Sequence, residues 1–247
     1  MRFVPKRIMA DAPTTTDSEA YVQDLFSSIA PKYDFINAVL SLLRHNAWRR
    51  FAVKKARVCA GERALDVCCG TGDLALELAR AVGPTGRVVG VDFAQPMLTI
   101  ARRKAARLGF GQVEFLQANA CSLPFADESF DCAAIAFGLR NVRSVRDVVR
   151  EMARVTRPGG RVVSLEIFGL HRLPVAAPWR IYFDVLAPRA AGLFGGRREA
   201  YDYLSRSVRS FVSREQLSEQ FSECGLSDVE CWGLALGAVC VHVGTKK

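Results

Sequence analysis

The sequence lacks any apolar run that approaches the roughly 18 to 20 residues needed to cross a bilayer. Its first residues, Met1 to Arg7, contain no apolar stretch of signal-peptide length. None of its eight cysteines belongs to a Cys-x-x-Cys motif, and most lie in apolar runs, as reduced core cysteines do. These absences argue against a spanning helix, a disulfide framework and a zinc site. We therefore expect a cytoplasmic protein without a bound metal.

Positive charge is in excess, and it is unevenly distributed. The formal net charge is +9, with 34 Lys and Arg against 25 Asp and Glu. Residues 1–60 hold ten basic against five acidic side chains, and residues 169–212 hold seven against three. The rest of the chain is balanced at 17 of each sign. An anionic partner, either nucleic acid or a membrane surface, therefore has to be considered.

Length and composition favour one domain. Half of the 247 residues are apolar, which is enough for a substantial core. We expect a flexible tail at 1–20, because it is rich in Pro and Thr and has little apolar periodicity. The single domain expected at 21–247 divides into four segments: N-terminal helices at 21–60, a core at 61–168, an insertion at 169–212, and a C-terminal helix with two strands at 213–247.

Short β-rich runs alternate with helical patterns through the core segment. Such alternation predicts an α/β fold with a mostly parallel sheet and helices on both faces. The core strands are expected at 64–68, 87–91, 113–117, 132–137 and 161–167, and two last strands at 229–232 and 238–243. The helices that follow from apolar spacing are expected at 74–81, 96–108, 145–155 and 214–224.

A glycine turn follows the first predicted strand. Gly70 and Gly72 let the backbone approach a ligand, and the next helix offers free N–H groups at its amino terminus. Ligands of doubly wound sheets bind at this carboxyl edge. The same spacing also fits the relaxed dinucleotide fingerprint, and a purely structural turn is a third interpretation.

Polar residues also end the next two strands. Asp92 closes the second, where a carboxylate can accept hydrogen bonds from both hydroxyls of a ribose, as in NAD enzymes and methyltransferases. Asn119 and Ala120 follow the third, where an amide and backbone N–H groups can read an adenine edge. Dehydrogenases do not usually present this arrangement, and the sequence has no Tyr-x-x-x-Lys pair. The combination favours a methyltransferase site over a dinucleotide site.

Some segments are more specific than the glycine turn. They are Phe26-Ser27-Ser28-Ile29-Ala30-Pro31-Lys32-Tyr33-Asp34, Asp66-Val67-Cys68-Cys69-Gly70-Thr71-Gly72-Asp73 and Ile135-Ala136-Phe137-Gly138-Leu139-Arg140-Asn141-Val142. They resemble the menaquinone/ubiquinone biosynthesis C-methyltransferase family, and the resemblance covers nearly everything after residue 20. The Phe-Gly-Leu-Arg-Asn run is its most specific part.

The resemblance implies a Rossmann-like class I methyltransferase with a mostly parallel seven-stranded sheet, N-terminal helices and a helical insertion that caps the substrate site. The implied cofactor is S-adenosyl-L-methionine. The family pattern places its contacts at Thr71, Asp92, Asn119 and Ala120, with Gly70 forming the turn.

The reaction implied by the resemblance is methylation of the quinol ring of a prenylated precursor, with demethylmenaquinol converted to menaquinol. A ubiquinone-pathway quinol and another lipid or small aromatic are the alternative substrates. A basic nucleic-acid-binding module is the non-enzymatic alternative, and it fits less well because the basic segments contain no known DNA or RNA motif.

A ring carbon is a poor nucleophile, so a positive group near an ionising quinol hydroxyl would lower the barrier. Arg140 is the candidate catalytic residue, and it would orient water or stabilise a quinolate because guanidinium hardly titrates. The alternative is an arginine that caps a loop. Tyr33 and Asn37 either line the entrance or serve packing, and His242 is expected to be structural.

The insertion suggests how a prenylated substrate is reached. Arginines alternate there with bulky apolar side chains that include Trp179, Tyr182 and Phe183. Such a surface could meet anionic head groups, giving a peripheral contact at the inner face of the cell membrane. The same side chains could instead form a lid or a homodimer contact, and the sequence leaves these alternatives open.

Overall fold

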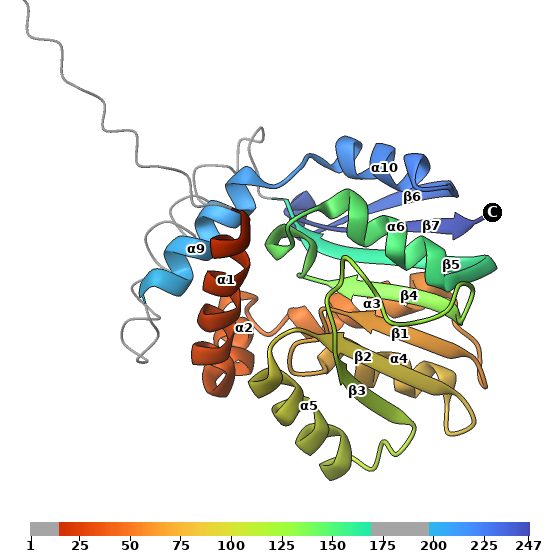
Figure 1. Cartoon of the computed structure of the whole chain (residues 1–247), viewed down its shortest axis with the longest axis horizontal. Helices are drawn as coiled ribbons and strands as arrows, with labels where there is room; N and C mark the ends of the chain where they lie inside the picture. Colours follow the sequence, from red (N-terminus) through yellow and green to blue (C-terminus); the bar gives the residue numbers. More distant parts are fainter. Residues whose placement is uncertain (1–14, 169–197) are drawn as a thin grey trace, which may run out of the picture.

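In the computed structural model of the protein, which describes residues 15–168 and 198–247, seven strands form one sheet in the order β3-β2-β1-β4-β5-β7-β6 (Figure 1). Strands β1 to β5 pair in parallel, and β7 is antiparallel to both β5 and β6. The strands are β1 Arg63–Val67, β2 Arg87–Asp92, β3 Val113–Gln117, β4 Phe130–Ala136, β5 Thr156–Ile167, β6 Leu226–Leu234 and β7 Val239–Lys246. The expected mostly parallel seven-stranded sheet is confirmed.

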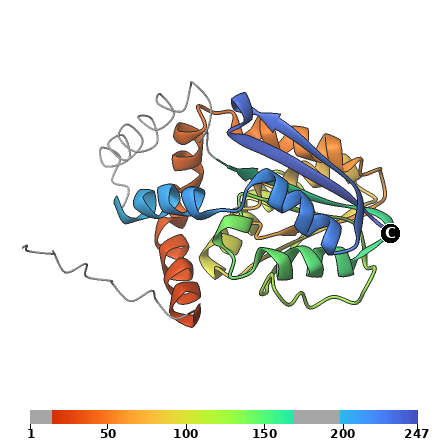
Figure 2. The same ribbon diagram turned by 90° about the horizontal axis from the view of Figure 1, so that it is seen from above.

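Helices cover both faces of the sheet, as the alternating pattern predicts (Figure 2). The described α-helices are α1 Thr15–Ile29, α2 Tyr33–Leu40, α3 His45–Ala56, α4 Asp73–Val82, α5 Gln95–Arg107, α6 Val145–Val155, α9 Arg198–Ser210 and α10 Arg214–Glu223. Helices α3, α4 and α5 pack on one face, and α6 and α10 on the other. Because both faces are buried, the central strands are apolar on both sides.

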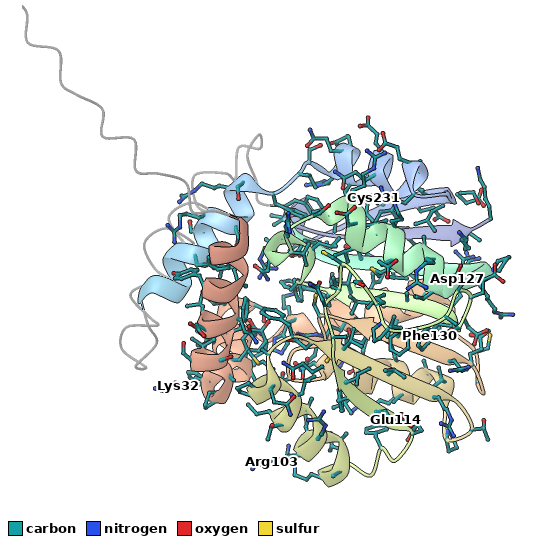
Figure 3. All side chains as sticks on the ribbon, in the orientation of Figure 1. Lys32, Arg103, Glu114, Asp127, Phe130 and Cys231 are labelled. Atoms are coloured by element: carbon teal, nitrogen blue, oxygen red, sulfur yellow. The ribbon has the colours of Figure 1, made fainter. Side chains whose placement is uncertain are left out.

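The two halves of the core explain the strand patterns. Ala64 packs toward α3 and α4, whereas its neighbour Leu65 packs toward α6, and both side chains are fully buried. Phe130 lies in the α6 layer against Phe125, with ring centroids 5.0 Å apart. Arg103 is an exposed side chain on the outer surface of α5 (Figure 3).

Helices α1 and α2 lie together with α9 beside the sheet, whereas α3 belongs to one of its helical layers (Figure 1). Tyr203 of α9 contacts Tyr21 and Phe26 of α1, with ring centroids 6.3 and 6.4 Å apart. A short 3-10 turn, η1 at Ala30–Lys32, joins α1 to α2. Segments from opposite ends of the chain thus meet near the edge where the parallel strands end.

Two boundaries differ from expectation. Helix α1 begins at Thr15, inside the range expected to be a flexible tail. Strand β5 begins at Thr156 rather than at residue 161, with a register irregularity opposite the start of β4. Residues 157–160, which contain the Pro-Gly-Gly run, have no partner in the register with β4, and pairing resumes at Arg161.

The other predicted elements are found close to their expected bounds, and the N-terminal helices are present. Residues 1–14 and 169–197 lie outside the described residues. Much of the insertion, including Trp179, Tyr182 and Phe183, therefore lies outside them as well. No helix in the described ranges is long and apolar enough to cross a bilayer.

Candidate active site

A cavity of about 360 Å³ opens at the carboxyl ends of β1, β2, β3 and β4. Its wall consists of the loops after these strands and of residues from α1 and α2. The lining residues are Val22, Gln23, Phe26, Tyr33, Cys68, Gly70, Val91, Asp92, Phe93, Met97, Ala118, Asn119, Ala120, Cys121, Ala136, Phe137, Gly138, Asn141, Val142 and Arg143. The cavity therefore forms where ligands of doubly wound sheets bind.

The glycine turn has the backbone geometry that close approach to a ligand requires. Cys68, Gly70 and Gly72 all have positive φ, at 55°, 52° and 84°. A Cβ on Gly72 would lie within 3.1 Å of atoms of Phe115 and Ala101, so a larger residue would force packing to shift. The turn leads directly into α4, whose first residue is Asp73.

Asp92 is almost fully buried, and its carboxylate organises the turn. One oxygen accepts from the backbone N–H of Gly70 at 2.8 Å, and the other accepts from that of Ala94 at 2.9 Å. Burial raises the pKa of Asp92, although these backbone donors oppose the shift. Each carboxylate oxygen keeps acceptor capacity beyond one bond, and Asp92 lines the cavity. It is thus placed to accept from ribose hydroxyls.

Asn119 and Ala120 form the next part of the wall. The Asn119 side-chain oxygen accepts from the backbone N–H of Cys121 at 2.8 Å, and its backbone bridges to Ser122. The amide is thereby held at the rim of the cavity by its own turn. Gly70, Asp92, Asn119 and Ala120, four residues expected to touch the cofactor, are brought together around one space.

Asp66 lies beneath the turn rather than in the cavity wall. It is fully buried near the end of β1, and neither carboxylate oxygen has a well-formed hydrogen bond. Burial raises its pKa well above the ordinary value, with the nearby Ala75 N–H and Arg49 charge opposing. The fit of S-adenosylmethionine rests on residues that do line the cavity: Asp92 keeps acceptor capacity for hydroxyl groups, and Gly70 leaves room for close approach.

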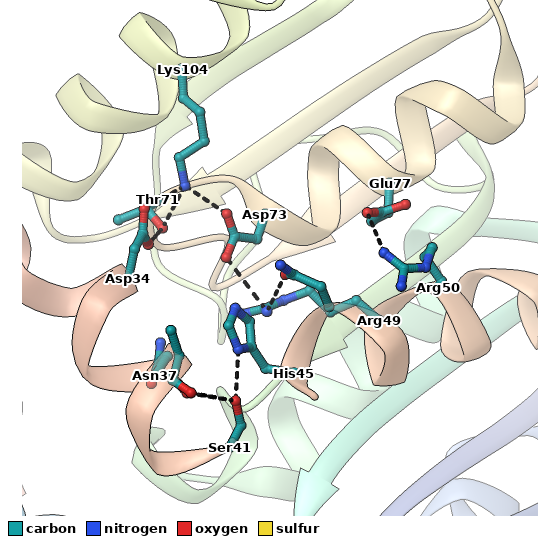
Figure 4. A network of polar contacts seen from close by, with 12 residues as sticks. Asp34, Asn37, Ser41, His45, Arg49, Arg50, Thr71, Asp73, Glu77 and Lys104 are labelled. Carbon is teal, nitrogen blue, oxygen red and sulfur yellow. Dashed lines mark hydrogen bonds and ion pairs between the residues drawn. The ribbon is translucent and has the colours of Figure 1, made fainter. Parts of the chain in front are cut away.

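Thr71 lies elsewhere than expected. It does not line the cavity, and its side chain is buried behind the turn. Its hydroxyl donates to Asp34 Oδ1 of α2 at 2.5 Å and accepts from Lys104 Nζ of α5 at 3.3 Å (Figure 4). A direct cofactor contact by Thr71 stays a prediction, and the observed contacts link the turn to the N-terminal helices.

Arg140 makes the contacts of a loop-capping residue. Its Nη1 donates to the backbone oxygen of Phe137 at 2.7 Å and to Glu166 Oε1 at 2.6 Å. The side chain is buried and does not line the cavity, although its Nε has no hydrogen-bond partner. Its charge also acts on Tyr33, which does line the cavity. Arg140 therefore lies behind the cavity wall, close enough to Tyr33 for its charge to act on that wall residue.

Asn141 is the site residue that the sequence reasoning missed. It lines the cavity, its Nδ2 donates to the Phe137 carbonyl at 3.2 Å, and its Oδ1 is buried without a hydrogen-bond partner. An acceptor without a partner, on a residue of the cavity wall, is suited to a ligand hydroxyl. Its place beside Arg140 in the Phe-Gly-Leu-Arg-Asn run was the signal that could have identified it.

The other residues considered in the sequence lie either in the cavity wall or in the core. Tyr33 lines the cavity, and burial raises its pKa while a side-chain hydrogen bond from Asn37 lowers it. His242 is buried, with Nε2 3.1 Å from the backbone oxygen of Arg214, as a structural histidine would be. Burial raises the thiol pKa of both Cys68 and Cys69, which disfavours a nucleophilic role.

Solved structures share this fold at low sequence identity. A SAM-dependent methyltransferase from Aquifex aeolicus has a TM-score of 0.61 and 19% identity, covering 86% of this chain and 96% of that one. The [4+2]-cyclase SpnF has a TM-score of 0.57 and 21% identity, covering 81% of this chain and 80% of that one. One of these proteins is a methyltransferase and the other a cyclase, so the likeness shows the fold alone.

The similarity in sequence to known enzymes is more specific than the likeness of fold. A demethylmenaquinone methyltransferase of Halalkalibacterium halodurans is 42% identical over 234 residues, covering 94% of this chain and 95% of that protein. A demethylmenaquinone methyltransferase of Geobacillus kaustophilus is 42% identical over 234 residues, covering 93% of this chain and 98% of that protein. The ubiE/COQ5 methyltransferase family matches residues 14–246.

These matches confirm the enzymatic interpretation over the nucleic-acid-binding one, and they confirm S-adenosylmethionine as the cofactor. They also span the N-terminal helices, the cavity wall and the two C-terminal strands. The chain belongs to the ubiE/COQ5 methyltransferase family and is an S-adenosylmethionine-dependent C-methyltransferase.

Proposed function

We propose that the protein methylates a ring carbon of a prenylated quinol, with demethylmenaquinol as substrate and menaquinol as product. The observation that carries this proposal is the similarity to two demethylmenaquinone methyltransferases at 42% identity over nearly the full length of each chain. Because the similarity includes α1 and α2, it covers residues of the cavity wall as well as the cofactor core.

The wall of the cavity supports an aromatic substrate. Phe26, Phe93 and Phe137 line it, and Met97 and Val142 are further apolar residues of the wall. Flat rings bind favourably between aromatic and aliphatic side chains. When bound, S-adenosylmethionine supplies a methyl group that its sulfonium already activates. The protein's task is then to align the quinol with that methyl group and to exclude water.

The cofactor contacts are assigned to Gly70, Asp92, Asn119 and Ala120. Asp92 would accept from the ribose hydroxyls, and the Asn119 segment would read the adenine edge. Thr71 would support the turn from behind through its hydrogen bond to Asp34. The position of all four residues in the cavity wall supports this assignment.

Arg140 is assigned a role in stabilising the negative charge that develops on the quinol oxygen. Its unpartnered Nε and its electrostatic effect on Tyr33 support this role. Glu166 holds the guanidinium in place from the opposite side. Since guanidinium stays protonated, Arg140 would orient a water molecule or donate toward the oxyanion rather than remove the proton.

The proposed substrate can be tested by methyl transfer. Purified protein with methyl-labelled S-adenosylmethionine is given demethylmenaquinol, a 2-methoxy-6-polyprenyl-benzoquinol, or RNA. We expect label in menaquinol at the fastest rate. Faster labelling of the benzoquinol would indicate the ubiquinone-pathway substrate, and labelling of neither quinol would contradict the proposal.

A peripheral membrane contact is proposed for delivery of the prenylated substrate. Leu42 and Leu43, which follow α2, are 73% and 75% exposed, and the exposed Arg44 comes next. Apolar side chains beside a cation suit an interface with anionic lipid. The basic and aromatic residues of 169–197 belong to the same proposal but lie outside the described residues. A homodimer stays a prediction without an observation of its own.

A further inference from the structure

Residues 15–40, which form α1, η1 and α2, are called the N-terminal lid below. Four of its residues line the cavity: Val22, Gln23, Phe26 and Tyr33. The position of the lid therefore decides the shape of one wall of the site. The contacts that hold the lid against the core therefore matter for the site.

The apolar contact between the lid and the core is one cluster at the start of α5. Ala30 of the lid is buried there with Ala94 and Met97, and partly buried residues pack around them: Phe26, Ile29, Tyr33 and Ile100. Beside this cluster, Gln23 Nε2 donates to the Phe93 carbonyl at 3.1 Å. Each face of the sheet has a far more extensive buried cluster. Directional polar contacts add to this apolar contact and specify how the lid is seated.

Asp34 at the start of α2 is the centre of these polar contacts. Its Oδ1 accepts from the Thr71 hydroxyl at 2.5 Å, and its Oδ2 lies 2.7 Å from Lys104 Nζ (Figure 4). Thr71 belongs to the glycine turn, and Lys104 to α5. One carboxylate thus joins the lid to two core elements, next to the cavity-lining Tyr33.

Lys104 extends the contacts across the base of the turn. Its Nζ lies 2.6 Å from Asp73 Oδ1, and Asp73 Oδ2 lies 3.5 Å from Arg49 Nη1 of α3. Burial alone would raise the pKa of Asp73, but the charges of Arg49 and Lys104 outweigh it and lower that pKa. Two acids face two bases, so the cluster is balanced. Arg49, Lys104 and Asp73 are largely shielded from water, whereas the Asp34 side chain is 43% exposed.

We propose that Asp34 and Lys104 form a latch that seats the N-terminal lid on the cofactor-binding turn, so that lid closure and cofactor retention are coupled. The inference rests on the proposed cofactor site around Gly70 and Asp92. Both latch residues act through others: Asp34 holds Thr71 and fixes its neighbour Tyr33, and Lys104 holds Asp34 against Asp73. They are positioning residues rather than catalytic ones.

The coupling follows from the placement of Thr71. Its side chain is 2% exposed, and its hydroxyl donates to a residue of the lid. When the lid lifts, Thr71 loses that acceptor, and the turn loses a support additional to the one that Asp92 gives at Gly70. A bound cofactor that fixes the turn therefore favours the seated lid, and a seated lid favours the bound cofactor.

The test compares Lys104→Met, Asp34→Asn and the double variant with the parent protein. Calorimetric titration with S-adenosylhomocysteine should show about tenfold weaker binding for each single variant, which corresponds to about 1.4 kcal/mol. The double variant should lose little more than either single one, because the two residues act on the same contact. Hydrogen exchange should become faster in residues 22–40 and stay unchanged in β1 and β4.

Two controls separate a latch from a general loss of charge or of stability. Arg103→Met removes an exposed cation from the same helix and should leave affinity and exchange as in the parent. Lys104→Arg keeps the charge and should restore most of the affinity. If Lys104→Met binds as tightly as Arg103→Met does, or if the losses from Asp34→Asn and Lys104→Met simply add, the latch is wrong.

The readouts do not depend on the quinol. A parent protein that methylates no quinol would contradict the proposed substrate, yet the affinity and exchange differences would still support the latch. Conversely, normal transfer to demethylmenaquinol by the parent together with unchanged exchange in every variant would keep the function and overturn the latch.

Discussion

Arg140 and Glu166 form a buried ion pair, with Nη1 and Oε1 2.6 Å apart and the side chains 8% and 0% exposed. Glu166 near the end of β5 also accepts from the backbone N–H of Ile167 at 2.8 Å. Through Arg140 it reaches the Phe137 carbonyl, which belongs to the loop after β4. The pair therefore ties the loop that lines the cavity to the end of the neighbouring strand.

Arg140→Ala is expected to lose turnover by about a hundredfold while cofactor affinity is retained, because the proposed role is exerted on the substrate's developing charge. Steady-state methyl transfer and calorimetric titration measure the two quantities. Arg140→Lys keeps the charge without the guanidinium geometry and should recover only part of the rate. Near-normal turnover in Arg140→Ala would leave the residue as a loop cap.

Glu166→Gln leaves the buried Arg140 guanidinium without its counter-ion. Removal of one partner of a buried pair typically costs about 3 to 5 kcal/mol, so urea denaturation should show a drop of at least about 2 kcal/mol after allowance for the remaining amide. A matched surface variant is Glu223→Gln, whose exposed pair with Arg146 should be worth under about 1 kcal/mol. Equal effects in the two variants would argue against a structural role for the buried pair.

Asp92→Ala is expected to weaken cofactor binding while the protein stays folded. Each hydrogen bond to a charged group contributes roughly 1.5 to 3 kcal/mol, and two ribose hydroxyls are proposed to donate to this carboxylate. Since Asp92 also accepts from Gly70 and Ala94, Asp92→Asn is the second variant, because it retains one acceptor oxygen for the turn. Unchanged S-adenosylmethionine affinity in folded Asp92→Ala protein would refute the assignment.

His45 predicts a dependence of stability on pH. Burial, followed by the positive charge of Arg49, lowers its pKa, while Asp73 and Asp34 oppose and Lys104 adds to the shift. Below about pH 6.5 the imidazole is protonated in the unfolded chain but stays neutral in the folded chain until the pH is lower. Because the unfolded state then binds more protons, the free energy of unfolding decreases on acidification.

The measurement for His45 is the free energy of unfolding in urea at pH 7.5 and pH 5.5. His45→Gln removes the titrating ring but keeps a polar side chain near Ser41. In the parent protein, Ser41 Oγ lies 2.7 Å from His45 Nδ1. The loss of stability between the two pH values should be smaller in this variant than in the parent. An identical loss would show that the dependence arises elsewhere, for example at Asp73.

Leu42→Ser with Leu43→Ser is expected to weaken binding to vesicles that contain anionic lipid. Two exposed leucines would lose their apolar contact with the bilayer, whereas Leu108→Ser changes an exposed leucine after the far end of α5 and should have no effect. Co-sedimentation should also fall with added salt in the parent protein. If the double variant sediments as well as the parent does, the contact does not involve this segment.

The cofactor-binding core is where sequence reasoning succeeded most fully. Strands with apolar residues at successive positions can only be stable between two helical layers, and their alternation with amphipathic helices leaves few topologies. Once that topology is given, Gly70, Asp92 and Asn119 must meet at one edge because they follow neighbouring parallel strands. In this core the residue periodicity and the topology of parallel sheets agree, so the position of a residue along the chain predicts the edge of the sheet at which it lies.

Residues whose roles depend on partners from distant segments could not be placed in this way. A cofactor contact by Thr71 stays a prediction, and nothing in the sequence indicated its side-chain hydrogen bonds with Asp34 and Lys104 behind the turn. Arg140 lies behind the wall because Glu166, on another strand, attracts its guanidinium.

The sequence by itself determined the sheet, its two helical layers and the edge at which the site forms, since these follow from periodicity and from the handedness of parallel connections. Only the tertiary structure decided which side chains reach the cavity. The physical reason is that hydrogen bonds and ion pairs act over about 3 Å, whereas a sequence pattern fixes a residue's element and face but not its distance from residues of another element.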